Sequence, residues 1–193
     1  MGMRKLILFL LVLFANYSFL SADDSNDVDQ RDQAGMTPFI TAASEGDIEL
    51  VKKLYKEGAD IEAMNYNSES ALMLAAFYGH IETVQILLEY GADVNHHIKK
   101  RQTALIEAAY QGHTDIVKLL LDYGADVNMR GKGETTALIG AVLRGSIETT
   151  KMLIEHGAEV NVKDKYGKSP LDYAKAWGVA PIINLLIEAG ATE

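Results

Sequence analysis

The chain between residues 103 and 128 alternates apolar and polar positions in a pattern typical of two short helices. Thr103 precedes apolar residues at three- and four-residue spacing, and its hydroxyl is suited to cap a helix start. Gly112 and Gly124 each follow an apolar stripe, where glycine favours the left-handed backbone that ends a helix. The polar stretch ADVNMRGKGE predicts an extended, turning connection. The expected buried residues are Leu105, Ala108 and Ala109, then Ile116, Val117, Leu120 and Leu121.

The same pattern recurs along the chain at a constant interval of 33 residues. Two series of glycines and one series of helix-starting threonine or serine residues keep this interval over five copies. Such a period indicates stacked units, each unable to bury its own apolar face alone. We therefore predict an all-α solenoid of five helix-turn-helix repeats with hairpin-like loops. The three series are Gly58, Gly91, Gly124, Gly157 and Gly190; Gly46, Gly79, Gly112, Gly145 and Gly178; and Thr37, Ser70, Thr103, Thr136 and Ser169.

The two helices of a unit differ in the size of their apolar residues. The first carries mainly alanines and the second carries leucines and isoleucines, so first helices are expected to approach one another more closely. The stack should therefore curve, with the first helices on the concave face that solenoids use for binding. Lys53 and Lys175 occupy positions that are apolar in other copies. Because a buried lysine without a partner is unfavourable, we expect both to be exposed at the two ends of a five-copy array.

The unit resembles the ankyrin repeat. The segment QTALIEAAYQGHTDIVKLLLDYGADVN, residues 102–128, follows the family pattern G-x-T-P-L-H-x-A-A-x-x-G-H-x-x-I-V-x-L-L-L-x-x-G-A-D-V-N over most of its length. The resemblance implies an ankyrin repeat domain over 32–193, with repeats at about 32–64, 65–97, 98–130, 131–163 and 164–193. The family's histidine after the leucine is replaced in every copy, which puts local rigidity in question. Its replacements are Ile40, Met73, Ile106, Ile139 and Asp172.

The N-terminus has the three parts of a secretory signal peptide. Arg4 and Lys5 precede the apolar run LILFLLVLFA, and small residues follow at Ser21 and Ala22. We expect a signal peptide over 1–22 that is cleaved after Ala22, with an uncleaved membrane anchor as the alternative. An acidic, disordered leader is expected over 23–31. The protein is then exported and is periplasmic or secreted.

Composition narrows the classes of function. The 193-residue chain has no cysteine and a formal net charge of −9. Disulfides, zinc–thiolate sites and thiol catalysis are excluded. A nucleic-acid partner is not expected, because duplex binders are normally basic.

The sequence contains no arrangement of residues typical of an enzyme. It has no G-x-S-x-G, no phosphate-binding glycine loop and no H-E-x-x-H. We expect no catalytic residues, no cofactor and no metal. His80 and His113 are expected to cap helices and fix turns. His96 and His97 are expected in a solvated loop, although an adjacent histidine pair leaves a metal site as the alternative.

The candidate binding residues lie at the C-terminal ends of the first helices and in the loops. Exposed aromatic side chains are suited to anchor an interface, and basic loop residues are suited to steer an acidic partner. The alternatives are aromatic residues that pack on neighbouring repeats and basic residues that are simply solvated. The candidates are Tyr66, Phe77, Tyr78, Lys99, Lys100, Tyr110, Gln111, Lys132, Leu143, Arg144, Lys165 and Trp177.

These features favour an exported, monomeric, non-enzymatic scaffold that binds another protein through its concave face and loop tips, and that protects or neutralises this partner. A secreted effector that acts in a host cell is one alternative. A metal-dependent enzyme or an accessory module of one is a second. Membrane contact is expected only if the signal segment stays uncleaved.

Overall fold

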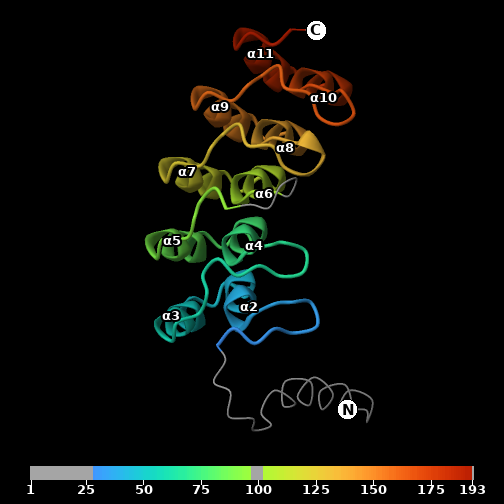
Figure 1. Cartoon of the computed structure of the whole chain (residues 1–193). Coiled ribbons are helices and arrows are strands. Elements are labelled where there is room, and N and C mark those ends of the chain that lie inside the picture. The colour runs from blue at the N-terminus through green and yellow to red at the C-terminus, as the bar shows by residue number, and fades with distance from the viewer. Residues whose placement is uncertain (1–27, 97–101, 193) are drawn as a thin grey trace, which may run out of the picture.

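The structure is a computed structural model that describes residues 28–96 and 102–192. Within these ranges ten α-helices follow one another as five antiparallel pairs, which stack in chain order (Figure 1). This confirms the all-α solenoid of five helix-turn-helix repeats. The pairs are α2 (Pro38–Glu45) and α3 (Ile48–Lys56), α4 (Ala71–Tyr78) and α5 (Ile81–Glu89), α6 (Ala104–Gln111) and α7 (Thr114–Asp122), α8 (Ala137–Arg144) and α9 (Ile147–Glu155), and α10 (Pro170–Trp177) and α11 (Ala180–Glu188).

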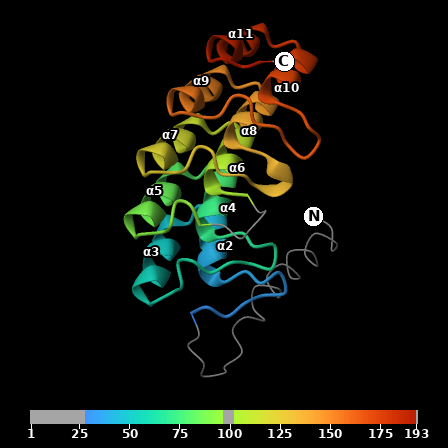
Figure 2. The same ribbon diagram turned by 45° about the horizontal axis from the view of Figure 1, so that its top comes forward.

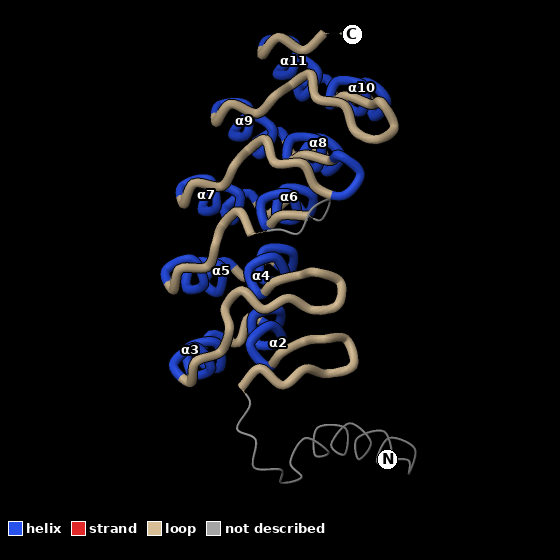
Figure 3. Tube along the Cα trace, viewed as in Figure 1, coloured by secondary structure: helices blue, strands red, loops and turns tan. Residues whose placement is uncertain are grey.

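In the described ranges, the long segments between one helix pair and the next project to one side of the stack (Figure 3). In the described part of the chain they contain one isolated antiparallel bridge, between Met64 and Ser70, and one 3₁₀ turn, Lys132–Glu134. The described loops therefore follow the path of a hairpin but do not form regular β-strands.

The first helix of every pair begins and ends in the same way. A threonine or serine hydroxyl at the N-cap accepts the backbone N–H three residues further on, as Thr103 does from Ile106 at 3.2 Å. A glycine with φ between +69° and +85° ends each of these helices. Side chains with a Cβ rarely adopt this backbone conformation, which explains the glycine at each of these positions.

The core runs as one continuous column between the helices. First helices pack closely because they bury small residues, and Gly140 shows how closely: a Cβ there would lie 3.2 Å from the backbone nitrogen of Tyr110. Second helices bury larger residues such as Leu120 and Leu153 and touch one another less. Figure 2 shows the two columns, with α2 to α10 in one and α3 to α11 in the other. This difference in packing favours the predicted curvature toward the first helices.

We call the surface formed by the first helices and the long loops the inner face. Lys53 on α3 and Lys175 on α10 are both exposed, as predicted for the two ends of the described stack.

The last residues of the expected acidic leader contact the first repeat. Val28 packs against the core, and the carboxylate of Asp29 accepts the backbone N–H of Asp60 at 3.1 Å. Arg31 donates to the carbonyl of Gly35 at 2.9 Å and also to the carbonyl of Met64. Residues 28–31 thus belong structurally to the repeat stack.

The expected signal peptide over 1–22 lies outside the described residues. Among the helices of residues 28–96 and 102–192, none combines the length and the apolar character needed to span a bilayer.

Candidate functional site

The inner face exposes large aromatic side chains at the C-terminal ends of first helices. Tyr78, Tyr110 and Trp177 are 56%, 49% and 67% exposed. Each of these three side chains therefore keeps about half or more of its surface exposed. Phe77 is only half-buried and meets the ring of Tyr78 edge-to-face, with the two ring centroids 5.0 Å apart. The sequence-predicted residues on α4 and α6 thus present one aromatic surface.

The same helix ends carry non-aromatic candidates. Gln111 and Leu143 are half-buried, and Arg144 is exposed. Arg144 lies over the turn of the preceding repeat, because a Cβ built at Gly112 would be 3.0 Å from its Nε. Arg144 therefore has a structural contact in addition to its exposed surface.

The loops supply a second group of candidates. The predicted residues Tyr66, Lys132 and Lys165 are exposed, Tyr66 at 70%. Tyr166, which is not among the candidates predicted from the sequence, is 72% exposed. The ammonium of Lys165 lies 4.8 Å from the centroid of the Tyr166 ring, which is a cation–π distance. The predicted loop residues Lys99 and Lys100 lie outside the described residues.

The histidines of the second helices do not cap their own helices, contrary to the prediction. The Nε2 atoms of His80 and His113 lie 3.0 and 3.1 Å from carbonyl oxygens of the preceding repeat, those of Ser44 and Phe77. No side-chain capping bond accompanies either ring. The ring of His80 also covers Gly46, where a Cβ would be 2.7 Å away. The predicted turn-fixing role is present, but it acts between repeats.

His96 is also not simply solvated. Its Nδ1 lies 2.8 Å from Oε2 of Glu62, one repeat earlier, and the residue is half-buried. His97 lies outside the described residues. Within 28–96 and 102–192, no three histidine or acidic side chains come together in a way that could hold a metal ion.

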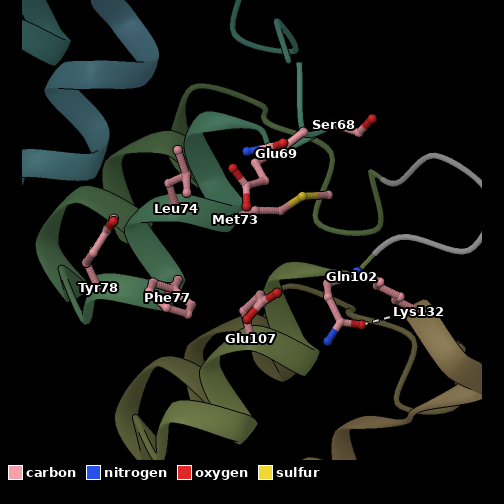
Figure 4. A pocket seen from close by; sticks show the side chains of 10 residues that line it. Ser68, Glu69, Met73, Leu74, Phe77, Tyr78, Gln102, Glu107 and Lys132 are labelled. Carbon is pink, nitrogen blue, oxygen red and sulfur yellow. Dashed lines mark hydrogen bonds between the residues drawn. The ribbon is translucent and has the colours of Figure 1, made fainter. Parts of the chain in front are cut away.

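A cavity of about 520 Å³ lies on the inner face between the second, third and fourth repeats. Figure 4 shows Met73 and Phe77 from α4 and Glu107 from α6 projecting into this space. Gln102 and Lys132 close one side, where the backbone N–H of Lys132 donates to Oε1 of Gln102 at 3.0 Å. The remaining lining residues are Asn67, Ser68, Glu69, Leu74 and Tyr78.

Glu107 is the most unusual residue of this cavity. Burial raises the pKa of its carboxyl group, and the neighbouring carboxylate of Glu69 raises it further. Sequence reasoning missed both acids. A signal was present, because the helix position of Glu107 carries a different residue type in every copy while its neighbours repeat. The five residues are Thr41, Leu74, Glu107, Gly140 and Tyr173.

A stack of helix pairs with an exposed, aromatic inner face defines a repeat protein with a binding surface. Comparison with protein families agrees with this class. The model described as ankyrin repeats (3 copies) matches residues 4–98, 42–131 and 105–192. The chain belongs to the ankyrin repeat family. No curated protein matches the chain.

Membership of this family implies a protein–protein interaction scaffold, since ankyrin repeat domains are typically non-catalytic binding modules. The residues of the inner face fit this role chemically. They provide aromatic surface, isolated charges and an open cavity, which are properties of a recognition surface.

Proposed function

We propose that this protein is an exported, monomeric adaptor that binds one protein partner through the inner face. The observation that carries the proposal is the exposure of Tyr78, Tyr110 and Trp177 along one side of the stack. Large, rigid aromatic side chains lose little conformational entropy on binding and dominate the energetics of many interfaces. Exposed apolar patches bordered by polar residues often mark protein–protein interaction sites.

The loops extend this surface. Lys132 and Lys165 add positive charge beside the aromatic side chains, in a chain whose formal net charge is −9. Such local charge raises the rate of association with a partner that is acidic at the matching edge. We therefore expect binding to weaken with salt mainly through a slower association rate.

Export is supported by the order of basic, apolar and small residues over 1–22. The partner is accordingly expected outside the cytoplasm. Fractionation of the producing cells tests this step: protein that lacks residues 1–22 in the periplasm or medium supports export, and full-length protein confined to the cytoplasm contradicts it.

The binding proposal is tested by crosslinking and affinity capture from the native envelope, with wild type beside a Tyr78→Ala, Tyr110→Ala double variant. We expect the variant to lose the captured partner while its circular dichroism is unchanged. Tyr123→Ala is the matched control, because Tyr123 is 44% exposed but follows the second helix α7. Equal capture by wild type and the double variant would remove the inner face as the interface.

A further inference from the structure

The cavity on the inner face has a chemistry that differs from the aromatic surface around it. We infer that it receives an arginine side chain of the protein partner, with the guanidinium between Glu69 and Glu107. This inference rests on the proposed function, because it names one feature of the partner that the inner face binds. It concerns a single contact and can fail while the rest of the interface stands.

The walls of the cavity suit the apolar part of such a side chain. Met73, Leu74 and Phe77 line it from α4, and the exposed ring of Tyr78 lies at its edge (Figure 4). An arginine side chain has a three-carbon stem that packs on apolar surface and a planar head that stacks on aromatic rings. The volume of about 520 Å³ also lies in the range of sites that hold small ligands or side chains.

The two carboxylates of the cavity, those of Glu69 and Glu107, favour a cationic ligand. Among the contacts of residues 28–96 and 102–192, no ion pair involves Glu69 or Glu107, and no hydrogen bond reaches the Glu107 carboxylate. The carboxylate of Glu69 accepts one bond, from Nδ2 of Asn65 at 2.8 Å. The raised pKa of Glu107 has burial and Glu69 as its causes, and Lys132 does not offset them. A bound cation would relieve the repulsion between the two carboxylates.

Arginine fits these groups better than the other cations. Its five N–H donors allow it to bond two carboxylates at once, whereas lysine offers a compact point charge that is strongly hydrated. A metal ion is disfavoured because, among the described residues, no third histidine or acidic side chain joins the two carboxylates of the cavity.

The test uses a capped five-residue peptide with one central arginine between glycines, titrated into ¹⁵N-labelled protein. Matched peptides carry lysine or citrulline at the centre; citrulline keeps the shape and loses the charge. We expect chemical-shift changes around Phe77, Tyr78 and Glu107 for the arginine peptide. Because a bond to a charged group is worth about tenfold in affinity, the citrulline and lysine peptides should bind at least about tenfold more weakly.

Glu107→Gln should weaken binding of the arginine peptide by a similar factor. Glu148→Gln is the matched control, since it removes the same charge from an exposed position at the start of α9. The inference is overturned if the citrulline or lysine peptide binds equally well, or if both glutamate variants lose the same affinity. If no arginine peptide binds but envelope capture still depends on Tyr78 and Tyr110, the inference is wrong and the proposed function stands.

Discussion

Asn128, after α7, is hydrogen-bonded to Gly157, which lies in the turn after α9, one repeat further along the stack. Its side-chain amide donates to the carbonyl of Gly157 at 3.1 Å, and its Oδ1 accepts the backbone N–H of Glu159 at 2.8 Å. Asn95 and Asn161 make the same pair of bonds to the repeats that follow them. The asparagine that ends the repeated phrase GADVN is therefore a connector between neighbouring repeats.

Asn128→Ala should lower the free energy of unfolding by about 1–2 kcal/mol, because two exposed bonds of ordinary strength are lost. Urea denaturation followed by circular dichroism measures the change. Asn184→Ala on α11 is the control, since Asn184 is exposed, and its replacement should alter stability by less than about 0.5 kcal/mol. Equal effects of the two changes would show that the connector bonds contribute nothing.

Tyr173 and Asp164 form a hydrogen-bonded pair in the last repeat. The hydroxyl of Tyr173 donates to Oδ2 of Asp164 at 2.6 Å, and this bond is the main reason that the pKa of Tyr173 rises to about 12. Burial alone would raise the pKa of Asp164. The bonds from Tyr173 and from the N–H groups of Lys168 and Tyr166 outweigh burial and lower it.

The two shifts define the pH range in which this bond stabilises the fold. The carboxylate contributes above the unfolded pKa of aspartate, about 3.9, and its contribution is lost as pH falls through the lower folded value. The phenol contributes below about pH 10, and its contribution is lost as pH rises toward about 12. Tyr173→Phe should therefore destabilise the protein between about pH 4 and 10, by about 1.5–3 kcal/mol, and much less outside that range. A pH-independent difference would contradict this account.

Glu107→Gln should stabilise the isolated protein at neutral pH. Burial and Glu69 raise the pKa of Glu107, so its ionised form is disfavoured by folding, and stability falls as pH rises through the unfolded value. The glutamine has no charge to desolvate. Denaturation at pH 7 and at pH 3.5 measures the effect: the variant should be more stable at pH 7, with the difference shrinking at the lower pH. No gain at pH 7 would show that the carboxylate is well solvated.

Lys175→Ala should change the free energy of unfolding by no more than about 0.5 kcal/mol, because the residue is exposed on α10. The equivalent position in the third repeat is Ala109, which is fully buried. Ala109→Lys should therefore cost several kcal/mol or prevent folding, since the ammonium would be buried between α6 and its neighbours. Thermal unfolding of the two variants makes the comparison, and a stable Ala109→Lys protein would contradict the packing of first helices described above.

Local chemistry explains how much of the fold could be predicted from the sequence. A cap at Thr103 and a left-handed glycine at Gly112 act within a few residues, so their pattern is readable from one copy. The constant period then extends that single unit to the whole stack. Tyr78 and Trp177 are the last residues of α4 and α10, but the sequence leaves open whether such aromatic side chains are exposed or pack on neighbouring repeats.

Contacts between repeats could not be predicted in the same way. The sequence predicts a local capping role for His80 and a solvated position for His96, yet their partners are Ser44 and Glu62, more than thirty residues away. The cavity could not be predicted from a single repeat either, because its walls come from three repeats whose residues differ at equivalent positions. Its most informative residue, Glu107, becomes unusual only once Glu69 is placed beside it.

The connector positions also set a direction along the stack. Each connecting asparagine reaches forward to the repeat that follows it, and at the first junction Glu62 does the same by accepting the backbone N–H of Asp93 and pairing with His96. An inner repeat is therefore held from both sides, whereas the first and the last described repeats each have one neighbouring repeat to hold them. In dilute denaturant the molecule should fray from its two ends, and the middle repeats should stay folded for longest.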